Sequence, residues 1–434
     1  MEVHAEVKMV KTTKTVKLVL CVFIFFIMML FGCRSDVKIE PAAEDVFKHW
    51  AAAGFLAQKV EESKGFIAGT NQKTNGSDYA YLYDNAVAAI ALSYAGADWH
   101  AQKIADAMVF AQGHDRKFHD GRLRNAYISG DAKSDSGRSL MAEKVTIRLP
   151  GFWQDGRWQE DSYTVSTSTG NMAWSIIALC TVAKNAPEMQ REQYLAAAIF
   201  AADFVMSLKS DHGGFTAGYE GWDDAQTKVT YLSTEHNIDL VVAFSSLADA
   251  IEEKDSVKAM EYRNAAKYAK DFVFSMYDKD LCCFYTGTEI NEKTVSKGVI
   301  PLDANTLAIL AFSEDLKDVY KIISFVEKRM TVGEGFDFSA GDLDGIWNEG
   351  TAQMAVCYSV LGSSDKYQKM MDYLKTQVDV DGSIPAADRD GVSTGFVIIG
   401  SDILWEYHNT QSIGATGWLA FAQMNRNPLG KNPE

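Results

Sequence analysis

Six apolar segments that open on polar residues are spread along the chain. Each carries Asp, Asn, Glu, Ser or Thr at its start and continues as an alanine-rich run without a wide polar face. A helix that is apolar on most sides is buried on most sides, so we predict six inner helices. They run from Tyr83 to Leu92, Thr169 to Leu179, Ser233 to Phe244, Leu302 to Phe312, Trp347 to Tyr358 and Ser412 to Ala422.

Amphipathic segments with charged faces alternate with these apolar helices. In one of them Glu261, Arg263, Lys267 and Lys270 form the stripe expected to face solvent. Six apolar and six amphipathic helices in alternation predict six helical hairpins, which can close into a double-walled ring with the apolar helices inside. The amphipathic segments cover residues 43–62, 98–112, 189–209, 256–277, 315–330 and 364–377.

Two long stretches interrupt this alternation. Residues 128–168 show no helical period and are rich in Ser, Asp, Gly and Arg. An insertion of this length in a compact fold is typical of a functional lid or of a disordered segment. Phe152, Trp153 and Trp158 within it favour a lid that docks over the centre of the ring. We expect residues 386–410 to form a second such loop.

The N-terminus has the organisation of an export signal. Lysines up to Lys17 precede an uninterrupted apolar run of 14 residues from Leu18 to Phe31. That run is short for a membrane span and suits the core of a signal peptide. We therefore divide the chain into a signal segment, a linker, one large domain and a tail, with the boundaries 1–33, 34–41, 42–427 and 428–434.

The signal segment ends in Leu30-Phe31-Gly32-Cys33, which resembles the bacterial lipoprotein box. The resemblance implies lipidation at Cys33 and a protein tethered to a membrane in the cell envelope, outside the cytoplasm. Phe31 departs from the small residue usual at its position. The alternative is a plain signal anchor in which Cys33 has no role.

Composition and charge exclude several classes of protein. Hydrophobic residues make up 47% and charged residues 23%, which rules out a disordered chain. Lys and Arg number 42 against 58 Asp and Glu, and a formal net charge of −16 supplies no basic face for a nucleic-acid partner. The 9 Trp, 18 Tyr and 23 Phe suit both a large helical core and a cleft that stacks on sugar rings.

The sequence predicts neither a metal site nor a disulfide framework. Cys180 and Cys357 lie in apolar helical runs as small buried hydrophobes, and the cysteine spacing fits no zinc template. Asp342 and Asp344 fall in a calcium-loop-like spacing that lacks the full series of ligands, so we interpret them as turn residues. No P-loop, HExxH or GxSxG motif is present.

The alternation of helices resembles the six-hairpin glycosidase superfamily, the (α/α)6 toroids, over nearly all of residues 42–427. Glu349-Gly350-Thr351-Ala352 and Ala415-Thr416-Gly417-Trp418 look like segments of exported bacterial toroid proteins. The resemblance implies an all-α (α/α)6 toroid with short β-hairpins and long loops on its rim. Related toroids also serve as polysaccharide lyases, sugar epimerases and terpenoid cyclases, so the fold narrows the function without fixing it.

In such a toroid the inner helices run the same way, so their N-terminal ends meet around a central funnel. Glycosidic hydrolysis needs one carboxyl group to protonate the leaving oxygen and another to activate water or attack carbon. We predict Glu235 and Glu349 as catalytic residues because Glu is a poor N-cap. Asp84 and Asp303 are the other candidates, and helix capping explains these two most easily.

Further residues at the same rim are predicted to bind substrate. The tryptophans offer apolar faces for pyranose rings, and His236 and Asp239 would orient Glu235, which lies one helical turn before Asp239. Arg124 would bind a carboxylated sugar or pair with an acid. The predicted substrate-binding residues are Asn85, Arg124, Tyr127, Trp174, His236, Asp239, Trp347 and Trp418.

The sequence therefore favours a lipid-anchored glycoside hydrolase that acts on an oligo- or polysaccharide and uses no cofactor. A polysaccharide lyase or epimerase is one alternative, for which Tyr127 with Arg124, or His236 with Asn237, would supply the base and the neutralising group. A non-catalytic glycan-binding or assembly lipoprotein is the other. In that protein the acids would pair with lysines or cap helices without facing the funnel.

Overall fold

The computed structural model describes residues 47, 49–69, 78–134, 137–141, 144–397 and 402–432. The predicted signal segment 1–33, with Cys33, and the linker 34–41 lie outside the described residues. Among the residues that are described, no helix is long and apolar enough to cross a membrane.

Helices dominate this part of the chain, and its sheets have only two or three strands. The twelve helices of the described residues are α3 (Ala51–Ser63), α4 (Leu82–Tyr94), α5 (Asp98–Gly113), α6 (Thr169–Ala183), α7 (Glu188–Met206), α8 (Thr234–Ile251), α9 (Ser256–Ser275), α10 (Leu302–Phe312), α11 (Val319–Met330), α12 (Asn348–Val360), α13 (Ser364–Gln377) and α14 (Ile413–Met424). All six predicted apolar segments and all six amphipathic ones are helical, which is consistent with an (α/α)6-like fold.

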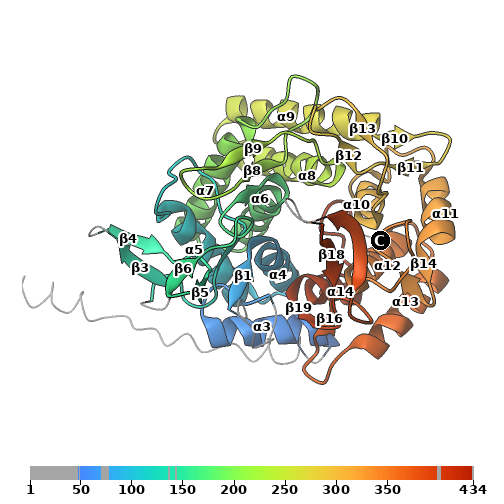
Figure 1. Cartoon of the computed structure of the whole chain (residues 1–434), viewed down its shortest axis with the longest axis horizontal. Coiled ribbons are helices and arrows are strands. Elements are labelled where there is room, and N and C mark those ends of the chain that lie inside the picture. The colour runs from blue at the N-terminus through green and yellow to red at the C-terminus, as the bar shows by residue number, and fades with distance from the viewer. Residues whose placement is uncertain are drawn as a thin grey trace, which may run out of the picture. The chain divides into compact units, whose positions relative to one another are not determined.

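The strands lie in the connections between helices and pair antiparallel (Figure 1). They are β1 (Tyr79–Tyr81), β2 (Ala126–Ile128), β3 (Arg138–Met141), β4 (Lys144–Ile147), β5 (Phe152–Gln154), β6 (Arg157–Gln159), β7 (Thr167–Ser168), β8 (Gly218–Glu220), β9 (Thr227–Val229), β10 (Tyr277–Asp278), β11 (Cys283–Phe284), β12 (Gly287–Thr288), β13 (Val295–Ser296), β14 (Thr331–Val332), β15 (Gly335–Phe336), β16 (Ile384–Pro385), β17 (Val392–Val397), β18 (Leu404–Tyr407) and β19 (Gln411–Ser412).

The even-numbered helices contact one another in a closed series. Helix α4 packs on α6, α6 on α8, α8 on α10, α10 on α12, α12 on α14, and α14 again on α4. The odd-numbered helices pack outside them, and Figure 1 shows this order around the centre of the view. Helix α6 is buried at every position but Asn171, whereas α11 buries one stripe. The even-numbered helices are therefore the inner ones.

A side chain near the start of each inner helix forms hydrogen bonds with the backbone of the preceding connection. Asn237 shows the full pattern. Its Oδ1 accepts the N–H of Phe215 at 2.8 Å, and its Nδ2 donates to the carbonyl oxygens of Phe215 (3.1 Å) and Ser233 (2.8 Å). Asn85 holds Ile67 in the same way, and Asn305 holds Phe284.

The other three inner helices use a simpler acceptor at the equivalent place. The hydroxyl of Thr351 accepts the N–H of Phe336 and that of Thr416 accepts the N–H of Ile384, while the sulfur of Met172 accepts from Leu123. We call Asn85, Met172, Asn237, Asn305, Thr351 and Thr416 the anchor residues. All are buried, so each fixes a helix N-terminus to the turn before it.

Replacing an anchor residue should destabilise the fold. Asn305→Ala removes three buried hydrogen bonds, to Phe284 N, Phe284 O and Pro301 O, and leaves the backbone groups without partners. We expect the free energy of unfolding to fall by about 2–4 kcal/mol in urea denaturation. The exposed Asn185, which bonds only to Asp98 at the surface, is the matched control, and Asn185→Ala should change it by less than about 0.5 kcal/mol. Equal effects of the two substitutions would contradict the anchor role.

Candidate active site

The first turns of α4, α12 and α14 meet through a chain of hydrogen bonds. The Tyr83 hydroxyl donates to Oε1 of Glu349 at 2.6 Å, and Nε1 of Trp418 donates to the Tyr83 oxygen at 2.8 Å. Tyr83 also packs edge-on against Trp174 of α6. Residues far apart in sequence thus converge on Glu349, as the predicted rim requires.

Asp84 lies beside Glu349 because Gly414 leaves room for both. A methyl group on Gly414 would lie 2.9 Å from Oε2 of Glu349 and 3.0 Å from Oδ1 of Asp84. The two carboxyl oxygens are therefore no farther apart than the sum of these distances. No side chain separates them on the α14 side.

Glu235, Asp239 and Asp303 are the remaining members of the group. The charges of Asp303, Asp239 and Glu349 all act on Glu235, and Asp303 also acts on Asp239. Asp239 is fully buried, and within the described chain only the indole N–H of Trp174 favours the charged form of its carboxyl. We call Asp84, Glu235, Asp239, Asp303 and Glu349 the carboxyl cluster.

The spacing between each anchor residue and the residue two places before it explains which side chains face the centre. Tyr83, Glu235, Asp303 and Glu349 each lie two positions before the anchor residue of their helix. Two residues span about 200° of an α-helix, so a side chain two places from the anchor points nearly opposite to it. Because the anchors face the preceding turns, these four side chains face the middle. The equivalent positions in α6 and α14 are Gly170 and Gly414.

Burial raises the pKa of every carboxyl in the cluster. It raises the pKa of Glu349 to about 8, helped by the charges of Asp84 and Asp303 and opposed by the Tyr83 hydrogen bond. It raises the pKa of Asp84 to about 7 and that of Asp303 to about 6, where the hydrogen bond from Ala304 N favours the charged form. Burial and neighbouring acids raise the pKa values of Glu235 and Asp239 well above their usual range.

In the part of the chain that the structure describes, no cationic side chain neutralises these acids. Among the described residues, none of the ion pairs includes a member of the carboxyl cluster. Nor does a Lys or Arg charge lower the pKa of any of them. The cluster is therefore held partly protonated near neutral pH, as a general acid must be.

Tyrosines from the two long connections complete the site, and sequence reasoning did not assign them. Burial and the charges of Glu349, Asp303 and Glu235 raise the pKa of Tyr407, which lies on β18. Burial raises the pKa of Tyr163, which comes from the first insertion, and the charge of Glu235 is a smaller cause. Its ring packs edge-on against Trp405 of β18. The two connections thus touch each other beside the acids.

The three predicted tryptophans lie in the wall rather than on the surface of the site. Trp174, Trp347 and Trp418 are almost fully buried. Trp418 holds Tyr83, Trp347 stacks on Tyr407 at 5.5 Å, and Trp174 packs between Tyr83 and Trp418. They offer no open face to a sugar ring, so their part is to position the tyrosines.

Three other predicted substrate-binding residues are occupied in structural contacts. Asn85 is an anchor residue, and the Tyr127 hydroxyl accepts the N–H of Arg124. The guanidinium of Arg124 is fully buried between Asp115, with bonds of 2.6 and 2.8 Å, and Asp223, with one of 2.5 Å. Arg124 therefore pairs with acids, the second of the two roles considered from the sequence.

His236 and Asp239 flank Glu235 without hydrogen bonding to it in the described structure. Burial lowers the pKa of His236 to about 4, so the ring is neutral at physiological pH. Its Nε2 lies 3.5 Å from the Ser168 hydroxyl, and the bare Cα of Gly170 lets the ring pack against α6. Asp239 acts on Glu235 through its charge.

One group of described carboxylates is close enough to share a cation. Ligand atoms of Asp337, Asp342 and Asp344 lie within 4.8 Å of one another. However, Asp337 accepts the N–H groups of Phe338 and Asp344, and Asp344 accepts that of Ser393. Two of these carboxylates thus hold the backbone of their own segment and that of Ser393 on β17.

Comparison with known proteins reveals a shared fold at low identity. No family model matches the chain, and neither does any curated protein. A glycosidase structure is 12% identical with a TM-score of 0.59 over 88% of this chain and 98% of its own, and a variant of it was solved in complex with glucose. A cellobiose 2-epimerase from Bacillus thermoamylovorans is 11% identical with a TM-score of 0.57 over 85% and 95% of the two chains. A D-mannose isomerase is 11% identical with a TM-score of 0.55 over 90% and 99%. These neighbours are toroid-type (α/α)6 enzymes, and the likeness concerns the fold alone.

The raised pKa values predict an unusual dependence of stability on pH. A carboxyl whose pKa is higher in the folded than in the unfolded state stabilises the fold at low pH, and this contribution is lost as the pH rises through the folded value. For Glu349 the loss falls between about pH 4.5 and about pH 8. We expect Glu349→Gln to be more stable than the wild type at about pH 8, by at least about 1 kcal/mol, and to lose the difference by about pH 4.

Urea denaturation across this pH range measures the effect. Glu253→Gln, at an exposed position, is the matched control and should parallel the wild type at every pH. A Glu349→Gln profile parallel to the wild type would show that Glu349 is not buried among acids in solution.

Proposed function

We propose that the protein is a glycoside hydrolase that cleaves an oligo- or polysaccharide by carboxyl acid/base catalysis. The observation that supports this most is the carboxyl cluster: five acids from four inner helices, partly protonated near neutral pH, with no base paired to them among the described residues. Buried acids without counter-charges cost folding free energy, which a purely structural role does not explain. The solved glycosidases of the same fold agree with this proposal.

Glu235 acts as the general acid and Asp303 as its ionised partner. Glu235 is only partly buried, so substrate can reach it, and its raised pKa keeps the proton available. It gives that proton to the glycosidic oxygen as the bond to the anomeric carbon breaks. Asp303, with a pKa of about 6, is largely ionised at neutral pH. It takes the proton of the water that attacks the anomeric carbon.

Glu349 and Asp84 bind the sugar beside that pair. Glu349 is fixed by Tyr83, and with a pKa of about 8 it donates a hydrogen bond to a sugar hydroxyl at neutral pH. Asp84 lies next to it, across the space left by Gly414. The hydroxyl of Tyr407 reaches the same region from β18.

The described contacts do not favour the alternative functions. A lyase that acts on uronates needs a cation to neutralise the sugar carboxylate, and Arg124 is already buried between two aspartates. Asn237, the neutralising group beside His236 in that alternative, is an anchor residue whose amide is bound to the backbone of Phe215 and Ser233. A binding protein that had lost its chemistry would pair or cap its acids, and the cluster is not paired in that way.

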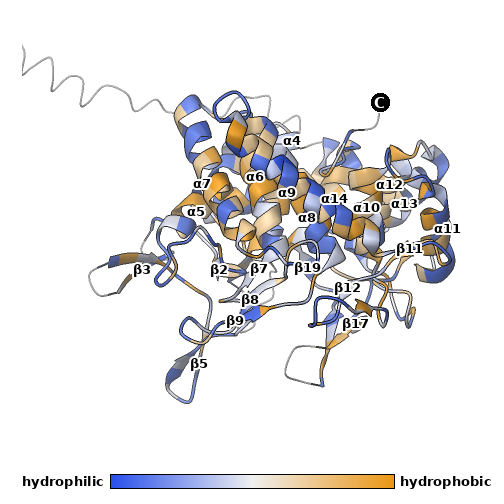
Figure 2. Ribbon diagram, turned by 90° about the horizontal axis from the view of Figure 1, so that it is seen from above, coloured by the Kyte–Doolittle hydropathy of each residue, from blue (hydrophilic) through white to orange (hydrophobic). Residues whose placement is uncertain are grey.

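We further propose that the six helix pairs form the complete (α/α)6 toroid within residues 42–427, with the carboxyl cluster at the end where the inner helices begin. The closed series of contacts from α4 to α14 supports this. The short strands gather at one end of the helices in Figure 2, and the two long connections with Tyr163 and Tyr407 belong to that end.

Substitution of the cluster tests the catalytic assignment. We expect Glu235→Gln and Asp303→Asn each to lower kcat by two or more orders of magnitude, since a positioned acid or base contributes about 10²–10⁴-fold. Glu349→Gln and Asp84→Asn should raise KM more than they lower kcat. Turnover would be followed by new reducing ends on a panel of oligo- and polysaccharides, with unsaturated and epimerised products measured in parallel.

Glu253→Gln, on the surface, should retain wild-type turnover, and melting temperatures would show that each variant is folded. Full activity in both Glu235→Gln and Asp303→Asn would move the assignment to Glu349 and Asp84. Unsaturated or epimerised products without reducing ends would contradict hydrolysis.

We also propose that Cys33 is lipidated and tethers the protein in the cell envelope. Support comes from the sequence: the lysines, the short apolar run and the terminal Gly32-Cys33. Cys33→Ala should abolish incorporation of labelled fatty acid and release the protein from the membrane fraction. Cys282→Ala, far from the signal segment, should leave labelling unchanged. Labelling that survives Cys33→Ala would contradict the lipoprotein interpretation.

A further inference from the structure

The first insertion does not cover the site with its tryptophans. Its hairpin β5–β6 extends away from the helices in Figure 2. Asp155 and Gly156 form its tip, both with positive φ (51° and 71°), as a tight two-residue hairpin turn requires. Trp153 and Trp158 lie directly opposite each other and pack edge-on, yet their exposed fractions are 71% and 40%. The expected lid therefore presents its indoles to solvent.

One residue holds two of the exposed indoles. Nε1 of Trp158 donates to a carboxylate oxygen of Glu160 at 3.3 Å, and Nε1 of Trp222 donates to the Glu160 backbone oxygen at 2.8 Å. Trp222 comes from the loop between β8 and β9 and is 52% exposed. With each N–H tied to the protein, the polar edge of the indole is satisfied and the apolar faces stay accessible.

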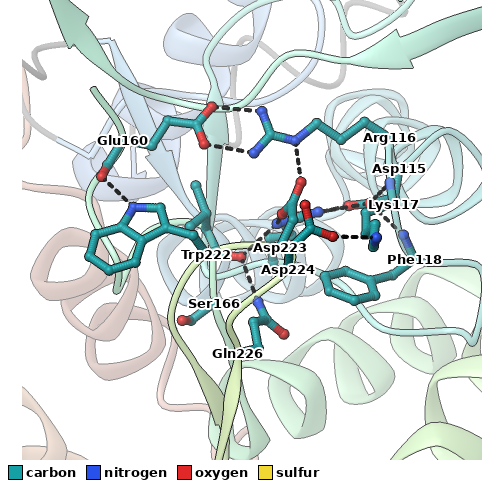
Figure 3. Close-up of polar contacts among 12 residues, drawn as sticks. Asp115, Arg116, Lys117, Phe118, Glu160, Ser166, Trp222, Asp223, Asp224 and Gln226 are labelled. Atoms are coloured by element: carbon teal, nitrogen blue, oxygen red, sulfur yellow. Dashed lines mark hydrogen bonds and ion pairs between the residues drawn. The ribbon is translucent and has the colours of Figure 1, made fainter. Parts of the chain in front are cut away.

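Glu160 is itself fixed by the network in Figure 3. Arg116 grips its carboxylate with two hydrogen bonds of 2.7 and 2.6 Å and donates from Nε to Asp223 at 2.7 Å. Asp223 also accepts from the buried Arg124. Two-pronged arginine–carboxylate bonds of this kind are strong and directional. The network therefore immobilises a loop that carries exposed aromatic residues.

Gly151 fixes the orientation of Trp158 as well. A methyl group on Gly151 would lie 2.5 Å from two atoms of the indole ring and 2.5 Å from the backbone oxygen of Gln159, so only glycine lets β6 and its ring approach the backbone there. Rigid, exposed aromatic rings are costly in water unless they meet a partner.

We propose that Trp153, Trp158 and Trp222, the tryptophan platform, bind further sugar units of a neutral polysaccharide whose cleavable bond lies in the carboxyl cluster. The proposal rests on the proposed function and narrows its substrate to a polymer. Pyranose rings carry C–H groups on their faces, and these pack well on the electron-rich faces of indoles. The indoles are also pre-ordered, so binding loses little side-chain entropy.

The platform and the cluster are close enough for one polymer chain. Tyr163, whose pKa is raised in part by the charge of Glu235, follows Trp158 by five residues. Five residues span at most about 18 Å when fully extended. A polysaccharide bound at Glu235 can therefore continue over Tyr163 onto the platform.

Charge argues for a neutral polymer over a membrane surface. Arg116 and Lys117 are committed to Glu160, Asp223 and Asp224 in ion pairs. The hairpin β5–β6 carries one basic residue, Arg157, and one acidic residue, Asp155. It therefore has no cluster of basic residues that could bind anionic lipid headgroups or a uronic polymer.

Affinity electrophoresis of the full-length protein in detergent tests the platform. Gels would contain starch, mannan, xylan or β-glucan, with alginate as an anionic comparison. We expect at least one neutral polymer to retard the wild type, and the dissociation constant to rise at least tenfold in Trp153→Ala/Trp222→Ala. Gly151→Ala, which displaces Trp158 without removing an indole, should act in the same direction. Trp99→Ala is the matched control, because Trp99 is 40% exposed on α5, and it should bind as the wild type does.

Kinetics separate this inference from the proposed function. In the double variant the ratio of kcat/KM on the polymer to kcat/KM on a short oligosaccharide should fall at least tenfold. Wild-type hydrolysis of short oligosaccharides with an unchanged ratio in the double variant would overturn the platform alone. Platform-dependent binding without hydrolysis of any glycan would overturn the proposed function alone.

Four further results would overturn the platform. One is a wild-type protein that no neutral polymer retards. Another is equal weakening by Trp99→Ala. A third is binding of Cys33→Ala protein to phosphatidylglycerol vesicles that is lost with Trp153→Ala, which would identify a membrane-docking surface. The fourth is a dimer in sedimentation that dissociates with Trp222→Ala, which would identify an interface between copies.

Discussion

The hydrogen bonds that the anchor residues make to the preceding turns determine where the chemistry lies. Without these bonds the rotation of each inner helix about its axis would be undefined. Asn85, Asn237 and Asn305 satisfy both the N–H and the C=O of one apolar residue, so the helix cannot rotate without losing buried bonds. Once the anchor points outward to the turn, the residue two places earlier must point inward. The buried hydrogen bonds of the anchor residues thereby set the direction of four other side chains, those of Tyr83, Glu235, Asp303 and Glu349.

The same arrangement explains how the site can hold several carboxyl groups that repel one another. Fixing the inward positions by buried hydrogen bonds allows carboxyl groups to be brought together even though their mutual repulsion and desolvation oppose it. Burial of the large apolar core between the inner and outer helices offsets this unfavourable free energy. Because Glu235 and Glu349 gain nothing from counter-charges, these two acids retain protons at neutral pH. Proton retention is the property that glycosidic cleavage uses.

Local pattern predicted the helices and singled out all five acids of the carboxyl cluster, four as catalytic candidates and Asp239 as a residue that orients Glu235. Long-range contacts decided the rest. The segment 364–377 coincides with α13, whose charged face is evident from sequence, and the described part of the predicted segment 43–62 contains nearly all of α3. The predicted start of that segment at residue 43 lies outside the described residues. Trp174 and Trp418 look alike in sequence whether they stack on sugar or on each other. The burial of Arg124 depends on Asp223, 99 positions later, which no local pattern reveals. Tyr407 lies in a loop whose position follows only from its packing on Trp347.

Six near-equivalent inward positions would make a site with sixfold pseudosymmetry, which the proposed sugar substrate lacks. Gly170 and Gly414 break that symmetry by leaving two of the six places without a side chain. At Gly170 the vacancy is taken up by the His236 ring, and at Gly414 it is shared by Glu349 and Asp84. The acids are thereby gathered toward some sectors of the ring and withdrawn from others. A repeating scaffold thus acquires a site without rotational symmetry, in which an asymmetric ligand has one preferred orientation.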